Sequence, residues 1–272
     1  MTIQKIESCL DHDEARFKED GLVISAMVIA VCDAFSVPYD QNKPPIIHRG
    51  LGTGETVKEH FCQGIVNAAT EDLVGTVRVI DHTVGIFHTQ LKISYGLIKE
   101  PAYLSGLTFA AVKIDREIEI LQCGDCIAIW RFKDGSVEYT DNPVKRASIR
   151  DRALKAQLQQ QYGKENYRPH FTPLMMEQKN RDINNPESPE GYPALNGGLN
   201  LEMCRHLSLP TNNLNFLLLC TDGFLLFDWF NEPDRMKELA DIVQEHGVHY
   251  QLRQIRESGQ TTEAAAVAVW FD

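Results

Sequence analysis

Four acidic positions border apolar segments of the sequence, where their carboxylates could gather to bind metal ions. Asp33 and Asp222 each directly follow an apolar run. Glu263 precedes the last apolar run, and Glu14 precedes the first. Carboxylates at the ends of buried strands can converge at one edge of stacked sheets, and Mg²⁺ and Mn²⁺ prefer such oxygen ligands. Two such ions could lower the pKa of a bridging water and clamp a phosphoryl group.

Each of these positions, taken alone, is more typical of a turn or of a solvated strand end. Asp222-Gly223, for example, is a common turn dipeptide. Hydrophobic periodicity does not tell whether the four carboxylates meet in space. The metal-site hypothesis therefore depends on the elements that would position them.

Most apolar segments are short, rich in β-branched residues and separated by turn residues, which favours strands. Asp115-Arg116 and Asp134-Gly135 lie between pairs of such segments and predict hairpins. Sequential hairpins give antiparallel sheets rather than a doubly wound parallel sheet. The predicted strands cover residues 22–32, 73–80, 83–93, 108–114, 117–123, 126–132, 137–140, 214–220 and 264–271.

Helical spacing or charge pattern predicts helices over 54–70, 146–161, 236–246 and 249–257. The segment 162–210 is polar and rich in Asn and Pro, and we expect it to be an irregular excursion with a functional role. No linker composition divides the chain, so the sequence predicts a single domain over residues 1–272.

Composition narrows the classes of partner and compartment. The net charge of −11 argues against nucleic acid and against an anionic membrane surface as partners. The apolar run 22–32 is too short to span a bilayer, and the first residues lack the apolar stretch of a signal peptide. The seven cysteines are irregularly spaced, which favours a reducing compartment, and we expect a cytoplasmic protein.

Six short motifs follow one another along the chain: HDEA (12–15), VCDAFS (31–36), SGLTFAA (105–111), QCGDCIA (122–128), LLLCTDGF (217–224) and TEAAAV (262–267). Their order resembles the metal-dependent serine/threonine protein phosphatases of type 2C, in a divergent bacterial form. A further segment, 184–196, contains Gly191-Tyr192 and resembles a segment of the bacterial members. The resemblance spans nearly the whole chain.

The resemblance implies an α+β fold, an antiparallel β-sandwich of two sheets flanked by helices on both sides. It also implies two Mn²⁺ or Mg²⁺ ions at one end of the sandwich. Asp33 would bridge the two ions, and Asp222 and Glu263 would hold one of them. Glu14 would lie near the other ion, and the main-chain carbonyl of Ala34 would be a further ligand.

The implied activity is signalling by hydrolysis of phosphoserine and phosphothreonine on a protein substrate, with a metal-bound hydroxide attacking phosphorus. Three departures from the family pattern support an alternative, a weakened or inactive relative that binds a phosphoprotein or another partner. Ala34 stands where the family has glycine, Thr262 replaces an acidic residue, and Glu263 replaces an aspartate.

Other motifs point to weaker hypotheses. Cys123 and Cys126 have CxxC spacing but lack a second pair, so two cysteines beside a hairpin turn are favoured over zinc. The glycine-rich 50–54 stretch lacks the ending of a phosphate loop, and Ser36 lacks the flanking glycines of a hydrolase elbow. The aromatic residues of 224–230 are expected in the core; if exposed, they would form a partner surface.

Overall fold

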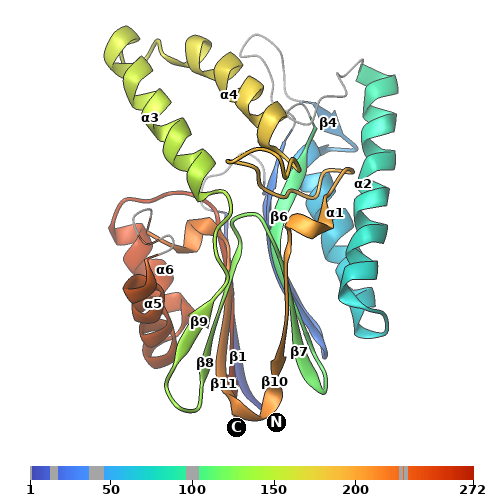
Figure 1. The fold of residues 1–272 in the computed structure, drawn as a ribbon, viewed down its shortest axis with the longest axis vertical. Coiled ribbons are helices and arrows are strands. Elements are labelled where there is room, and N and C mark those ends of the chain that lie inside the picture. Colours follow the sequence, from blue (N-terminus) through green and yellow to red (C-terminus); the bar gives the residue numbers. More distant parts are fainter. Residues whose placement is uncertain (1, 13–17, 37–45, 96–103, 227–228, 230–231) are drawn as a thin grey trace.

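Two five-stranded antiparallel sheets face each other in the computed structural model, which describes residues 2–12, 18–36, 46–95, 104–226, 229 and 232–272 (Figure 1). The first sheet has the order β1-β12-β11-β8-β9, with β1 Ile3–Asp11, β12 Ala264–Phe271, β11 Leu214–Cys220, β8 Ile127–Phe132 and β9 Val137–Tyr139. The second has the order β10-β7-β6-β3-β2, with β10 Arg205–Pro210, β7 Glu117–Cys123, β6 Gly106–Ile114, β3 Val28–Phe35 and β2 Asp20–Ile24.

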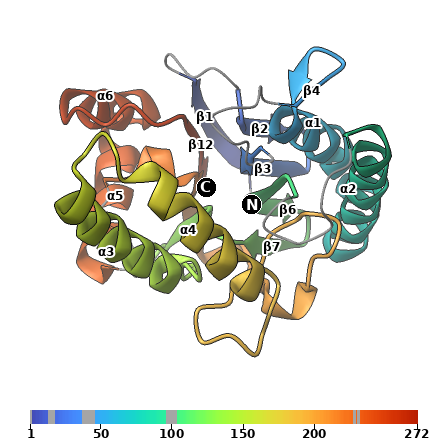
Figure 2. The same cartoon turned by 90° about the horizontal axis from the view of Figure 1, so that it is seen from above.

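Helices cover the outer faces of both sheets, as the resemblance implies, and a further helix pair lies at one end (Figures 1 and 2). The helices α1 Thr53–Ile65 and α2 Leu73–Tyr95 flank the second sheet, and α5 Pro233–His246 and α6 Val248–Glu257 flank the first. The end pair is α3 Lys145–Tyr162 and α4 Arg168–Asp182. A two-stranded hairpin, β4 Ile47–His48 and β5 Leu51–Gly52, precedes α1.

None of the helices that the structure describes is both long and apolar enough to cross a bilayer.

Strand β12 shows how the alternation of side chains builds the layers. Ala266 and Ala268 pack with the cluster under α5 and α6, whereas Val267 and Val269 pack in the cluster between the two sheets. All four side chains are buried. Because successive side chains of a strand point to opposite faces, one short apolar run serves two cores.

The helix α2 replaces the two strands predicted over 73–80 and 83–93, and this prediction was wrong. The buried positions of α2 include Leu73, Val77, Val84 and Leu91, whose spacing follows the helical repeat. Val79, which is 63% exposed, lies on the outer face. An apolar residue on this face makes the helical repeat harder to recognise in the sequence. A β-branched residue on the solvent side of a helix gives a strand-like composition to a helical segment.

The segment 22–32, predicted as one strand, is a hairpin of β2 and β3. Its turn is closed at Ser25, whose N–H donates to the carbonyl of Val28 and whose Oγ accepts from the N–H of Val28. The resulting register places Asp20 directly opposite Asp33. The first strand, β1, was missed because its exposed positions give it little apolar character.

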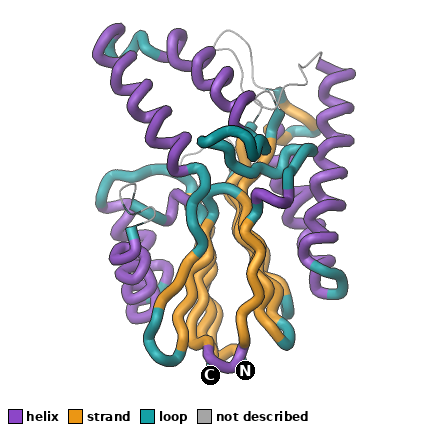
Figure 3. The backbone as a smooth tube through the Cα atoms, viewed as in Figure 1, coloured by secondary structure: helices purple, strands orange, loops and turns teal. Residues whose placement is uncertain are grey.

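The segment 162–210 is not irregular throughout, which corrects that prediction. It contains α4 and the edge strand β10, which pairs with β7. The remaining stretch between α4 and β10 runs as a loop over the end of the sandwich, as the tube in Figure 3 shows. The sequence of α4 has little amphipathic pattern, so the position of this helix depends on the tertiary contacts that are described below.

Candidate active site

The helices α3 and α4 cover one end of the sandwich (Figure 2). Strand ends bring acidic residues together at this end. β2 begins at Asp20, and β3 reaches Asp33 near its end. The short helix after β11 begins at Asp222, and Glu263 directly precedes β12. Asp125 lies in the turn between β7 and β8. Antiparallel strands that begin and end at one edge therefore gather these carboxylates.

Asp33 is at the centre of this group. Its carboxyl lies within hydrogen-bonding reach of both Asp20 and Asp222. Burial and the neighbouring aspartates raise the pKa of Asp33 well above its usual range. Burial is also the main cause that raises the pKa of Asp20 to about 8 and that of Asp222 to about 7. Buried carboxylates that repel one another form a site of concentrated negative potential.

Two threonines hold the aspartates in place. The Oγ1 of Thr221 donates to Asp20 Oδ2 at 2.7 Å and accepts from the N–H of Ala265 at 2.9 Å. Thr108, opposite Asp33 in the β3–β6 ladder, donates its Oγ1 to Asp125 Oδ1 at 2.8 Å. These bonds fix the acidic side chains to strands of both sheets.

Glu263 has a structural contact that the sequence did not indicate. Its Oε2 accepts the backbone N–H groups of Glu19 at 2.8 Å and of Asp20 at 2.6 Å. Glu19 itself is partly buried and accepts a hydrogen bond from Ser36, and its pKa is raised to about 7, mainly by burial. Glu263 therefore ties the start of β2 to the start of β12, across the two sheets.

The structure brings Asp33 and Asp222 together, with Glu263 beside them. Ala34 is a buried residue of β3, and its N–H donates to the carbonyl of Glu19. Glu14, the other expected ligand, lies outside the described residues. Sequence reasoning did not select Asp20 and Asp125 as site residues. Recognition of the turn at 25–27 would have revealed Asp20, because its register follows from that turn.

The carboxylates fit a hard divalent cation by their chemistry. Oxygen donors alone suit Mg²⁺ and Mn²⁺, and a bound cation would offset the burial and the mutual repulsion that raise the pKa values of these groups. Among the described residues, however, no group of three or more His, Cys, Asp or Glu side chains is arranged to hold a metal ion as it stands. Binding would thus require the carboxylates to turn toward a common centre.

A cavity of about 400 Å³ opens next to the aspartates. Asp33, Asp125 and Thr108 contribute to its lining from the sandwich, and helices α3 and α4 contribute most of the rest. Lys179 of α4 and Tyr192 of the following loop also line it. The acidic group is therefore accessible from a concave space between the sheets and the helix pair.

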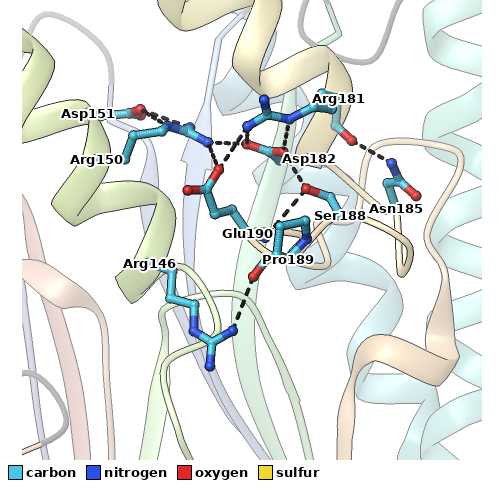
Figure 4. A network of polar contacts seen from close by, with 9 residues as sticks. All are labelled: Arg146, Arg150, Asp151, Arg181, Asp182, Asn185, Ser188, Pro189 and Glu190. Carbon is cyan, nitrogen blue, oxygen red and sulfur yellow. Dashed lines mark hydrogen bonds and ion pairs between the residues drawn. The ribbon is translucent and has the colours of Figure 1, made fainter.

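An ion-pair network fixes α4 to α3 beside this cavity (Figure 4). The carboxylate of Asp182, whose side chain is fully buried, accepts from Arg150 at 2.6 Å and from Arg181 at 2.9 Å. Glu190 pairs with the same two arginines, and Ser188 donates to Asp182. Burial alone would raise the pKa of Asp182, but hydrogen bonds from its partners outweigh that effect and hold the pKa below its usual value. The end of α4 is thereby held in position.

The CxxC cysteines and the described aromatic residues of 224–230 do not form a catalytic site. Cys123 and Cys126 are free, buried cysteines. The turn between them joins β7 of one sheet to β8 of the other, so the hairpin predicted there was wrong. Phe224 and Trp229 are buried in the core, as expected, whereas Phe227 and Phe230 fall outside the described residues.

The chain is similar in structure to bacterial serine/threonine phosphatases. The phosphatase PstP/Ppp of Mycobacterium tuberculosis matches with a TM-score of 0.60 and 15% identity, over 100% of both chains. Stp1 of Staphylococcus aureus matches with a TM-score of 0.59 and 12% identity, over 100% of this chain and 96% of that chain. The PstP catalytic domain in complex with two manganese ions has a TM-score of 0.57 and 15% identity, over 97% and 96% of the two chains.

A further similar structure, with a TM-score of 0.54 and 16% identity over 100% of both chains, is the PPM Ser-Thr phosphatase MsPP of Mycobacterium smegmatis in complex with cacodylate. No family model matches the sequence, and no curated protein is significantly similar to it. At these identities the likeness concerns the fold. The chain therefore has the fold of bacterial serine/threonine phosphatases of the PPM type.

Proposed function

We propose that the protein is a Mn²⁺- or Mg²⁺-dependent phosphatase that acts on phosphoserine and phosphothreonine of a protein substrate. The observation that carries this proposal is the position of Asp33, within hydrogen-bonding reach of Asp20 and Asp222 beside an open cavity. The fold and the manganese complex of a structural neighbour support it.

In this proposal Asp33 and Asp222 are the central metal ligands, with Asp20, Glu263 and Glu14 near them. When bound, the ions supply an acidified water and neutralise charge that develops on the phosphoryl group. Thr221 orients the carboxylate of Asp20, and Glu263 holds the backbone at the start of β2 through its two N–H contacts. The cavity between α3, α4 and the sheets admits the phosphorylated side chain.

A second candidate function is a phosphatase-like module that binds a phosphoprotein without turnover. It is favoured by Glu263, one of whose carboxylate oxygens is already occupied by two backbone N–H groups. An oxygen used in this way is less available to a cation. Measurements of turnover and of metal uptake distinguish the phosphatase from the binding module.

The Asp222→Asn variant tests the proposed activity. We expect the wild-type protein to hydrolyse p-nitrophenyl phosphate and a phosphothreonine peptide only when Mn²⁺ or Mg²⁺ is added. The variant should lose roughly a hundredfold or more of that rate, because an amide is a poor substitute for a carboxylate ligand. The measurement is the initial rate over a range of Mn²⁺ concentrations.

The matched control is Asp115→Asn, which makes the same chemical change at the exposed turn between β6 and β7. It should retain the wild-type rate. A folded wild-type protein whose rate never exceeds that of Asp222→Asn would contradict the phosphatase proposal and favour the binding module.

A further inference from the structure

A lysine of the end helices lies in the same cavity as the acidic group. Lys179, in the last turn of α4, lines this cavity together with Asp33 and Asp125. Its Nζ lies 5.8 Å from the centre of the ring of Phe35, two residues beyond Asp33. This cation–π contact places the ammonium group near the end of β3, and Phe35 and Lys179 both line the cavity.

Lys179 is attracted to the carboxylates but is not paired with them. Asp151, Asp125 and Asp33 all exert attraction on its ammonium group. Yet among the described residues no carboxylate oxygen lies within 4.0 Å of its Nζ. Burial is the main influence on the lysine and lowers its pKa. Lys179, Asp125 and Asp33 thus line one cavity without an ion pair between them, which leaves room for a ligand beside the ammonium group.

The backbone that carries Lys179 is held in position. Asp182, three residues further along α4, is the buried centre of the ion-pair network with Arg150 and Arg181 (Figure 4). The N–H of Ile183 donates to the carbonyl of Lys179 and closes the last turn of the helix. Fixed anchors of this kind restrict where the ammonium group can go, which is a requirement for a precise binding contact.

The charges indicate the class of ligand. A phosphate monoester carries about two negative charges at neutral pH and offers three acceptor oxygens. Divalent ions held by the aspartates would bind some of these oxygens and leave the others for a further cationic group. Lysine is a compact point charge that binds phosphate well. Lys179, which α4 contributes to the lining of this cavity, is available for this purpose.

We propose that Lys179 binds the phosphoryl oxygens of the substrate from the side opposite the aspartates, so that a phosphate monoester is clamped between α4 and the sheet ends. This inference rests on the proposed function, because it takes divalent ions at the aspartates as the other half of the clamp. It adds a substrate-binding residue from a part of the chain that none of the six sequence motifs contains.

The test measures two affinities by calorimetry for the wild type and for Lys179→Met, Lys179→Arg and Lys164→Met. The first is the affinity of the metal-free protein for Mn²⁺, and the second is the affinity of the Mn²⁺-loaded protein for inorganic phosphate. Lys164 is an exposed lysine between α3 and α4, outside the residues that line the cavity, and it controls for a general loss of charge. Circular dichroism checks folding, and Lys179→Gln is a second neutral variant should Lys179→Met fail to fold.

We expect Lys179→Met to weaken phosphate binding by about tenfold or more, with no loss of Mn²⁺ affinity. Lys179→Arg should retain most of the affinity for phosphate, and Lys164→Met should match the wild type. If the neutral variant that folds bound phosphate as tightly as the wild type, the role of Lys179 would be overturned while the proposed function stood. A wild-type protein that takes up no Mn²⁺ would overturn both.

Discussion

Replacement of Asp33 by asparagine should stabilise the metal-free protein and at the same time abolish its metal-dependent hydrolysis. Asp33 is close to several other carboxyl groups, and its pKa is raised well above the usual range by burial and by those neighbours. Asparagine has nearly the same shape without the charge, and its amide can donate to Asp20 or Asp222. We expect the melting temperature at pH 8 to rise by about 5 °C or more.

The sign of the effect depends on pH. A carboxyl whose pKa is raised by folding stabilises the folded state most below the unfolded pKa, which is about 4 for aspartate. This contribution is lost as the pH rises through the raised pKa, so the wild-type protein becomes less stable between pH 4 and 8. The asparagine side chain of the variant has no such proton to lose. The difference in melting temperature should therefore be near zero at pH 4 and largest at pH 8.

The measurement is thermal unfolding of the metal-free proteins across this pH range, together with rates of p-nitrophenyl phosphate hydrolysis in Mn²⁺. The exposed Asp115→Asn variant again serves as the control and should follow the wild type in both. A variant at position 33 that is less stable than the wild type at pH 8 would show that the carboxylates do not repel one another in the folded protein.

Replacement of Gly223 by alanine should destabilise the protein strongly. A Cβ at this position would lie 1.6 Å from the carbonyl oxygen of Glu263 and 2.7 Å from its carbonyl carbon. The neighbouring atoms are backbone, and Glu263 is also tied to the backbone of Glu19 and Asp20. Relief of the clash would have to shift the start of β12, so we expect a loss of about 3 kcal/mol or more in the free energy of unfolding.

Urea unfolding of Gly223→Ala beside Gly198→Ala provides the comparison. A Cβ at position 198 would meet its nearest neighbour, the Oδ1 of Asn196, at 3.6 Å, which is an ordinary contact. The control should therefore stay within about 1 kcal/mol of the wild type. Equal stability of the two variants would mean that the approach of the Glu263 carbonyl to Gly223 is not as close as the structure has it.

Much of the sheet structure could be predicted from the sequence, because short apolar runs between turn residues leave few alternatives. The strands β6, β7, β8, β11 and β12 agree closely with the predicted segments. The segment of α2 was predicted as strands because β-branched residues occupy both its buried face and its exposed face. This strand-like composition obscured the helical repeat of its buried residues. Prediction of α4 failed for another reason, since its sequence has little amphipathic pattern and its end is joined to Arg150 of α3 by the Asp182 network.

The candidate site was predictable only where a carboxylate directly adjoins an apolar run. Asp33 and Asp222 satisfy that condition, and the structure places them together. Asp20 became visible only through the hairpin register, and Asp125 through the turn that joins the two sheets. Lys179 is distant from the motifs in sequence and reaches the cavity through the packing of α4, which the sequence pattern does not reveal.

The central claim is that the carboxylates around Asp33 bind divalent cations, and calorimetric titration of the metal-free protein with Mn²⁺ tests it most directly. We expect saturable binding by the wild-type protein at about pH 7.5, and loss of this binding in the Asp33→Asn variant under the same conditions. A folded wild-type protein that gives no binding with millimolar Mn²⁺, or a variant that binds Mn²⁺ as tightly as the wild type, would contradict the claim.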